Sequence, residues 1–499
     1  MTDIPATGPA TGPTAEPASG PSTEAVAEST AESTAGSTAG STAGSTAGSA
    51  VEPAGPKTGA EPTVESTTGP GVDLESGHDT AADGGTAPEP AERQPLVRAL
   101  LGAVLHGNSA VVTTLAILLA LVVGALLIAL SDTEVITRFG YFFSAPGDAF
   151  SQAWLDIRSA YTALFSGAVG NPSDVSAAVN GQGSWSAVFG PISETVVTAT
   201  PLICAGLSVS LAFRAGLFNI GAEGQVIAGA ITAGYVGFAV SLPPVLHVFV
   251  AIAAGICGGG LWGFIAGWLK ARTGAHEVIT TIMLNYVALN LLLYLLATAA
   301  FQRPGRSDPI SFVVHGDARL PHLAGSSLRL HLGIVLALAA ALFMWWLLSR
   351  STLGFELRAV GSNADAARTA GMSVGRGYTV AMLLAGAFAG LAGVSQVLGT
   401  AYTLTPGISA NIGFDAITVA LLGRAAPLGT VLAGLLFGAL RAGGVQMQAQ
   451  TGVSVEMITV VQSLIVIFIA APPLVRAIFR LRGPRAGSET TAVAKGWNG

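Results

Sequence analysis

Apolar segments of about 20 residues, the length that a helix needs to cross a bilayer, recur between residues 111 and 471. In lipid the backbone must satisfy its own hydrogen bonds, so segments of this kind fold as helices. The sequence has 51% hydrophobic and 10% charged residues, a balance that ordinary soluble domains do not reach. We therefore predict an all-α polytopic membrane protein.

The apolar segments divide into about ten predicted spans, and one of them is unusually short. Segment 412–422 is too short to cross a bilayer alone unless it is broken or extended. Residues 150–165, outside the spans, are predicted to be amphipathic. The predicted spans are 111–130, 194–213, 216–242, 245–269, 278–301, 330–348, 378–399, 412–422, 428–446 and 455–471.

Residues 1–95 form a low-complexity tail of Pro, Gly, Ala, Ser, Thr and Glu with almost no large apolar side chains. Little burial is available to offset the entropy of folding, so we predict that this tail is disordered. Residues 1–98 hold 14 acidic and 3 basic residues, so the acidity of the chain belongs to the tail. The predicted organisation is this tail, a transmembrane domain at 96–476 and a cytoplasmic C-terminal tail at 477–499.

Basic residues in the short loops predict the orientation of the spans. With the N-terminus inside, the loops that hold Arg214, Lys270 and Arg424 lie inside together with the polar segment 353–377. Ten spans return the C-terminus, with Arg476, to the same side. The mildly basic balance of residues 99–499 therefore reflects cytoplasmic loops and gives no indication of nucleic-acid binding.

A polar insert, LGFELRAVGSNADAARTAGMSVGRG at 353–377, separates two long apolar runs. Asn363 can cap a short helix with an acidic first turn, and Gly371 can end it. Ala364, Ala367 and Gly371 recur at i, i+3 and i+7, which predicts a small, smooth face. We interpret the insert as a docking surface for another protein, and we expect a bulky side chain at Ala367 to disturb docking while the chain still folds.

Polar residues inside the predicted spans form the first candidate site, in GLFNIGAEGQ at 216–225. Asn219 and Glu223 are four residues apart and share a helix face, and Gln225 lies two residues further on. A carboxylate at membrane depth is costly and faces protein or water. This group either lines a solute path or is a polar helix start that bonds neighbouring backbone.

Two further candidates lie later in the chain. Glu277, Thr281 and Asn285 fall at i, i+4 and i+8 and form one polar stripe, which either lines a path or provides hydrogen bonds between helices. Asp415 lies near the start of the half-length segment, with Arg424 beyond it. Transporters break helices in this way at binding sites, although a tight helical hairpin has the same pattern.

Several catalytic classes are excluded. No lysine follows a glycine, so the chain has no Walker A loop, and it contains no GxSxG, HExxH or Cys/His cluster. Both cysteines fall inside apolar segments, as small core residues do. We therefore predict no catalytic residues, no metal site and no cofactor bound by this chain.

Four runs carry a resemblance to a known family: GLFNIGAEGQ, EVITTIMLNY, LGFELRAVGSNADAARTAGM and GFDAITVALLGRAAPLGTVLAGLLFGAL. In this order they resemble ABC importer permeases of the branched-chain amino acid, ribose and nucleoside group. The chain looks most like the nucleoside-type permeases that work with a basic-membrane-protein-like binding lipoprotein. The resemblance covers roughly residues 193–473, and the acidic tail lies outside it.

The resemblance implies a multi-pass subunit of a bacterial plasma membrane with both termini cytoplasmic. Its implied partners are a second permease, which suggests a heterodimer, two cytoplasmic P-loop ATPase subunits that bind ATP and Mg, and an extracellular solute-binding lipoprotein. The segment at 350–377 is implied to be the coupling helix set into the ATPase surface. The residues assigned to coupling are Glu356, Arg358, Gly361, Asn363, Ala366, Ala367 and Gly371.

The function expected from this resemblance is ATP-driven import of nucleosides or related small polar solutes. One alternative is an ion- or proton-coupled secondary carrier that uses Glu223 or Glu277 as its coupling carboxylate. A second alternative is a structural membrane assembly factor. The candidate residues of the translocation path are Asn219, Glu223, Gln225, Glu277, Thr281, Asn285 and Asp415.

Overall fold

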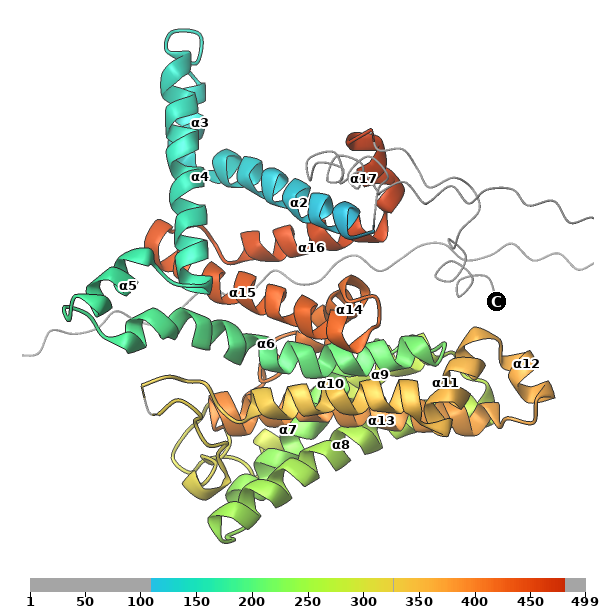
Figure 1. Ribbon diagram of the computed structural model, residues 1–499. Helices are drawn as coiled ribbons and strands as arrows, with labels where there is room; N and C mark the ends of the chain where they lie inside the picture. The colour runs from blue at the N-terminus through green and yellow to red at the C-terminus, as the bar shows by residue number, and fades with distance from the viewer. Residues whose placement is uncertain (1–108, 326, 481–499) are drawn as a thin grey trace, which may run out of the picture. The chain divides into compact units, whose positions relative to one another are not determined.

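The computed structural model describes residues 109–325 and 327–480 (Figure 1). Every longer regular element in this part of the chain is a helix. The predicted disordered tail at 1–95 and residues 481–499 of the C-terminal tail lie outside it. The elements are α2 (Ser109–Ser131), α3 (Thr133–Phe139), α4 (Pro146–Ala168), α5 (Pro172–Val179), α6 (Trp185–Arg214), α7 (Ala222–Ala239), α8 (Pro244–Thr273), α9 (Glu277–Leu296), η1 (Gly316–Ala318), α10 (Gly333–Arg350), α11 (Thr352–Ser362), α12 (Ala364–Thr369), α13 (Val374–Val394), η2 (Ser395–Ala401), α14 (Ile412–Leu422), α15 (Pro427–Thr451), α16 (Glu456–Ala470) and α17 (Pro472–Ile478).

Seven of the described helices are long and apolar enough to cross a membrane, which confirms an all-α polytopic membrane protein. They are α2, α6, α8, α9, α10, α13 with η2, and α15. Helices α16 and α17, which meet at a bend of 93°, count as an eighth span only if the two are taken together as one broken span. Each of the ten predicted spans matches a helix, but α7 opens with polar residues and α14 has only 11 residues. By length and hydropathy the structure thus supports seven or eight spans.

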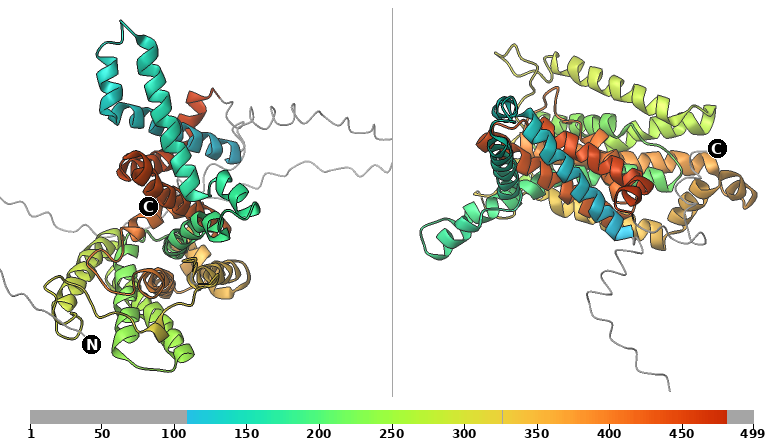
Figure 2. Two further views of the ribbon diagram at one scale, coloured as in Figure 1. Left: turned by 90° about the vertical axis from the view of Figure 1, so that its left-hand side faces the viewer. Right: turned by 90° about the horizontal axis from the view of Figure 1, so that it is seen from above.

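The two ends of the bundle differ in the segments that they carry. Helix α10 leads from the segment at 302–332 directly to α11 and α12, which form the insert predicted at 353–377. We call the end with α11 and α12 the insert end, and the opposite end, with residues 302–332, the loop end. The insert projects from the bundle in Figure 1 and in the right-hand view of Figure 2.

The most extensive packing between two helices is that of α8 against α13, and α6 and α7 also contact α13. A Cβ atom on Gly259 would overlap the backbone of Gly386 and Gly390, so the two helices meet backbone to backbone. Small residues allow this approach in lipid, where packing drives helix association. The glycines of α8 that face α13 at intervals of four residues are Gly255, Gly259, Gly263 and Gly267.

Helices α2, α4, α15 and α16 pack into a second cluster. The Tyr161 hydroxyl of α4 donates a hydrogen bond to the Leu121 carbonyl of α2 at 2.5 Å. Figures 1 and 2 show α4 running crosswise to α6. Its outward side exposes Phe150, Trp154 and Phe165, while Ala160 is buried, so the amphipathic character predicted for 150–165 is confirmed.

The insert folds as two helices, as its sequence predicts. The Asn363 side-chain oxygen accepts hydrogen bonds from the Asp365 and Ala366 amides, both at 3.0 Å, and so caps α12. Gly371 follows α12 with φ +83°, a conformation that favours glycine. The predicted cap and helix end are confirmed.

The expectation that Ala367 lies on an outward face is wrong. Ala367 is only 4% exposed and packs with Val360 and Val374 inside the insert. The helix needs this contact because α12 has no other apolar face to bury. A bulky residue at this position would therefore disturb the fold of the insert, and the outward face belongs to Ala366 and its exposed neighbours on α12.

Neighbouring glycines on α8 provide a matched test of the packing between α8 and α13. Gly259→Ala should lower stability by about 1–3 kcal/mol, because the added methyl group meets backbone that cannot move aside. Gly260→Ala should leave stability unchanged or raise it, since its nearest new contact, at 3.4 Å, is an ordinary one. The Tm of the purified protein in detergent measures both effects, and equal Tm values would contradict this packing.

Candidate functional site

Two helices begin inside the bundle, and their N-termini meet. After α6 the chain turns at Gly216 (φ +72°) before α7 begins, and residues 402–411 lead from η2 into α14. The Glu223 carboxylate of α7 accepts a hydrogen bond from the Gly413 amide of α14 at 2.7 Å. A Cβ atom at Gly413 would overlap the backbone of residues 222 and 223, so the two helix starts are in direct contact. Glu223 thus satisfies a helix N-terminus, where negative charge is favourable.

The polar side chains predicted at 216–225 form a buried network. The Asn219 amide nitrogen donates to the Gln225 side-chain oxygen at 2.9 Å, and the Gln225 amide nitrogen donates back at 3.1 Å. The Asn219 amide nitrogen also lies 3.1 Å from the Ser208 hydroxyl on α6. All three side chains are buried, so this network connects α6 to the start of α7.

The polar stripe of α9 supports the same helix start. The Asn285 side-chain oxygen accepts from the Gly224 amide at 2.8 Å, and its amide nitrogen donates to the Ile220 carbonyl at 2.9 Å. Thr281 is buried beside Gly221. In this structure the stripe therefore provides hydrogen bonds between helices, as one of its two interpretations predicts.

Glu277 lies apart from this network. Its carboxylate forms an ion pair of 2.7 Å with Lys270, and the Lys270 ammonium group lies over the Tyr378 ring at 5.2 Å. These contacts connect α8, α9 and α13 at the insert end. Both Glu277 and Lys270 are partly exposed there.

A cavity of ≈ 810 Å³ opens between α4, α5, α6, η2, α15 and α16. Its polar lining includes Gln396 and Thr400 from η2 and Arg441, Gln446 and Gln450 from α15. Amide, hydroxyl and guanidinium groups of this kind can donate and accept hydrogen bonds to a neutral polar solute. Of the described pockets and cavities, this one combines size with convergent polar groups.

Two ion pairs border the cavity. The Arg441 guanidinium pairs with Asp415 of α14, which connects that predicted candidate to the cavity wall. The Arg329 guanidinium pairs with Glu194 of α6 at 2.9 Å. Both arginines are thus paired with carboxylates, and Asp174 adds a further carboxylate to the lining. Among the predicted path residues, Asp415 is the one in direct contact with the cavity lining, and Asn219, Gln225, Thr281 and Asn285 lie in the buried network.

The π-helical element η2 supplies Gln396 and Thr400 to the cavity wall. The Leu320 amide donates to the Leu398 carbonyl at 2.9 Å, and the Val314 amide donates to the Tyr402 carbonyl at 2.8 Å. The His331 imidazole is buried against Gly399. The segment at 302–332 therefore holds η2 through backbone hydrogen bonds and packing, and the Arg319 guanidinium lies over the Tyr402 ring at 4.6 Å. Wide helical turns of this type are frequent at functional sites.

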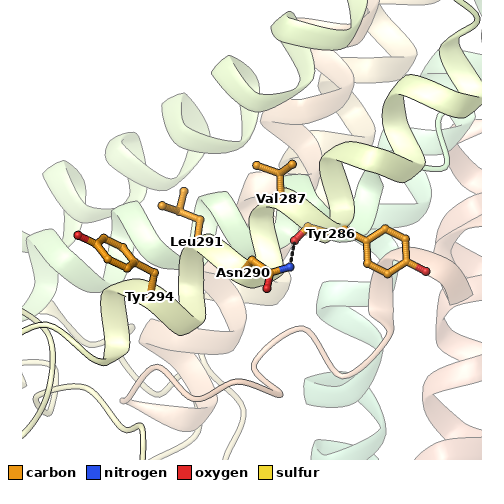
Figure 3. Close-up of a pocket in the computed structure, with 5 residues that line it drawn as sticks. All are labelled: Tyr286, Val287, Asn290, Leu291 and Tyr294. Carbon is orange, nitrogen blue, oxygen red and sulfur yellow. Dashed lines mark hydrogen bonds between the residues drawn. The ribbon is translucent and has the colours of Figure 1, made fainter. Parts of the chain in front are cut away.

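A second hollow, of ≈ 470 Å³, lies along α9 (Figure 3). It is lined by Tyr286, Val287, Asn290, Leu291 and Tyr294, all from this one helix. The Asn290 amide donates to the Tyr286 carbonyl at 2.8 Å. It is a groove on an exposed, largely apolar helix face and differs in kind from the polar cavity.

Some cavity residues were missed from the sequence. Arg441 lies inside the predicted span at 428–446, and an arginine at that depth is itself a signal for a functional group. Gln396 and Thr400 carry no comparable signal, since single polar residues are common at helix ends. Among the described residues, no three His, Cys, Asp or Glu side chains lie close enough to hold a metal ion.

Comparison with known proteins agrees with the resemblance seen in the four sequence runs. A family model described as the permease component of branched-chain amino acid transport systems matches residues 192–470. A guanosine ABC transporter permease of Bacillus subtilis is 44% identical over 302 residues, which cover 59% of this chain and 86% of that protein. A nucleoside ABC transporter permease of Lactococcus lactis is 36% identical, with 60% and 84% covered.

A sugar permease is also similar to this chain. A glucose ABC transporter permease of Haloferax volcanii is 35% identical over 323 residues, which cover 61% of this chain and 84% of that protein. No solved structure matches the chain.

Substitution of Glu223 distinguishes a structural role of this carboxylate from a role in proton coupling. Glu223→Gln should keep transport, because the Gln oxygen can still accept from the Gly413 amide. Glu223→Ala leaves that amide unsatisfied and should cost about 1–3 kcal/mol, measured as a lower Tm. A Glu223→Gln protein that folds normally but loses uptake driven by a proton gradient would favour the secondary-carrier alternative.

Proposed function

The chain belongs to the permease component family of branched-chain amino acid transport systems and is a permease subunit of an ABC importer, and we propose that its cargo is a nucleoside or a related small polar solute. The observation that carries the cargo assignment is the 44% identity to a guanosine permease over 86% of that protein's length. A sugar is the second candidate, supported by the glucose permease that is 35% identical.

Energy for import comes from partner subunits in this proposal. The chain has no Walker A loop, so ATP and Mg bind to cytoplasmic P-loop ATPase subunits. A second permease, in a heterodimer, and an extracellular solute-binding lipoprotein complete the importer. The outward faces of the chain contact membrane lipid.

The insert end is the cytoplasmic side in this proposal, and both termini lie there, in a bacterial plasma membrane. Arg214, Lys270 and the Arg424 backbone all lie at that end, in contact with α11, α13 or one another. An excess of basic residues is typical of cytoplasmic loops. The loop end then faces the binding lipoprotein.

Helices α11 and α12 dock on the ATPase surface and act as the coupling segment. Asn363, Ala366 and Gly371 are exposed on or beside α12 and form the contact face. Gly361 and Ala367 act from inside, since they hold the insert against the bundle. Glu356 and Arg358 lie on α11, where Arg358 is exposed and Glu356 is half-buried.

The polar cavity is the solute pathway in this proposal. A nucleoside offers ribose hydroxyls and base edges, which match the amide groups of Gln396, Gln446 and Gln450. Asp415 acts on the pathway through Arg441. The other candidates shape it indirectly by holding the broken helices in position. They are Asn219, Glu223, Gln225, Glu277, Thr281 and Asn285.

Purification and uptake together test this proposal. The protein should co-purify in mild detergent with a P-loop ATPase and a second polytopic chain. The complex, reconstituted with its binding lipoprotein, should take up radiolabelled guanosine or adenosine only with ATP, and excess unlabelled nucleoside should compete better than glucose. Competition by glucose alone would support the sugar alternative, and uptake by the single chain without ATP would overturn the importer assignment.

An exposed alanine on α12 tests the coupling face. Ala366→Trp should reduce co-purification of the ATPase because the new ring protrudes into the docking surface, while the Tm of the permease stays unchanged. The matched control is Ala300→Trp, an exposed alanine at the loop end. If Ala366→Trp retains the ATPase as well as the control does, α12 is not the docking element.

A further inference from the structure

We propose that Arg214 is the positioning residue that transmits movement of the coupling insert to α14, and that α14 is the movable wall of the solute cavity. This inference rests on the proposed function, since it assumes that ATPases act on the insert.

Helix α14 is bounded at both ends by residues in the left-handed conformation. Ala410 (φ +45°) and Asn411 (φ +59°) precede it, and Arg424 (φ +54°) and Ala425 (φ +49°) follow it. Six described residues other than glycine have a positive φ, and four of them flank this one helix. The left-handed conformation costs free energy in any residue that carries a Cβ atom. Residues held in it are found preferentially at functional sites and switch regions.

At the insert end, the Arg214 side chain donates hydrogen bonds to the backbone that follows α14. Its Nε donates to the Ala425 carbonyl at 2.9 Å, and a second guanidinium nitrogen lies 3.5 Å from the Arg424 carbonyl. The Arg214 side chain is exposed, so these bonds are not part of a packed core. The guanidinium group therefore holds the two left-handed residues together with the end of α6.

The same turn is pressed against the coupling insert. Gly361 of α11 has no room for a Cβ atom, because the Arg214 carbonyl and the backbone of Gly216 occupy that space. A backbone contact this close transmits displacement directly, since no flexible side chain lies between the two segments. Any movement of α11 must shift the turn at 214–216, and with it the guanidinium group of Arg214.

At its other end, α14 forms part of the cavity. Ala410 and Ile412 line the cavity directly, and the Asp415 ion pair joins the helix to Arg441 in the same wall. The Gly413 amide remains bound to Glu223, which gives the helix a fixed point at its start. A pull on residues 424–425 would thus tilt α14 about this point. The tilt displaces Asp415 and its ion pair with Arg441 on one side of the point and turns Ala410 and Ile412 on the other, which changes the shape of the cavity wall.

The test compares two exposed arginines at the insert end in the reconstituted importer. Arg214→Ala should retain ATPase binding and ATP hydrolysis, while the solute moved per ATP falls about tenfold, within the range of allosteric couplings. Arg272→Ala removes the same charge from the last turn of α8 and should keep the wild-type ratio. If Arg214→Ala cannot be purified, Arg214→Lys serves instead, because an ammonium group cannot hold both carbonyls in the guanidinium geometry.

A labelling measurement follows α14 itself. Ala410→Cys, made in a Cys257→Ser background, places a thiol on the cavity wall, and ATP should change its rate of reaction with a membrane-impermeant thiol reagent. Arg214→Ala should abolish this change, whereas a merely structural role would leave it intact in the folded protein.

An unchanged ratio of solute to ATP in Arg214→Ala would overturn the inference, as would an equal loss in Arg272→Ala or an ATP effect on Ala410→Cys that survives Arg214→Ala. Failure of the proposed function looks different. In that case the wild-type complex itself would show no ATP-dependent uptake, before any variant is made.

Discussion

The hydrogen bond between Glu223 and the Gly413 amide is the contact on which the interior of this bundle depends. Two helices begin away from water, and each start leaves amides without partners. The Glu223 carboxylate satisfies one start and Asn285 satisfies the other. An unpaired amide in such surroundings is costly, so the intramembrane carboxylate and amide side chains are explained first as requirements of broken helices. The Glu223 carboxylate has the position of a structural group that caps a helix start.

Close glycine packing complements this polar centre. Where Gly259 meets Gly386, α8 and α13 approach until their backbones touch, which gives the bundle a rigid pair of helices. Against this pair, α14 is short and bounded by left-handed residues. The contrast suggests a division of labour between a fixed frame and a small movable element, as transporters need for alternating access. The proposed solute cavity lies where α14, the proposed movable element, meets α15 and η2.

Local features were predictable to the level of single residues where their cause lies within a few residues. The Asn363 cap and the left-handed Gly371 follow from side-chain chemistry and backbone sterics within one turn, and both were anticipated. Which face of α12 is buried could not be predicted, because Ala367 is buried by Val360 and Val374 from neighbouring elements. Helical periodicity identifies a small face but does not say whether it packs inward or outward.

By itself, the sequence determined the all-helical membrane class, the position of the insert, the absence of an ATPase motif and the family, because each depends on composition or on short continuous runs. The tertiary structure alone decided which polar residues bond one another and which line a cavity. Asn219 and Asn285 are equally polar in sequence, and so is Gln396, yet two of them tie helices together and the third faces the cavity. The physical reason is that burial and partners are set by segments far apart in the chain, such as Arg214 and Ala425, which no local pattern connects.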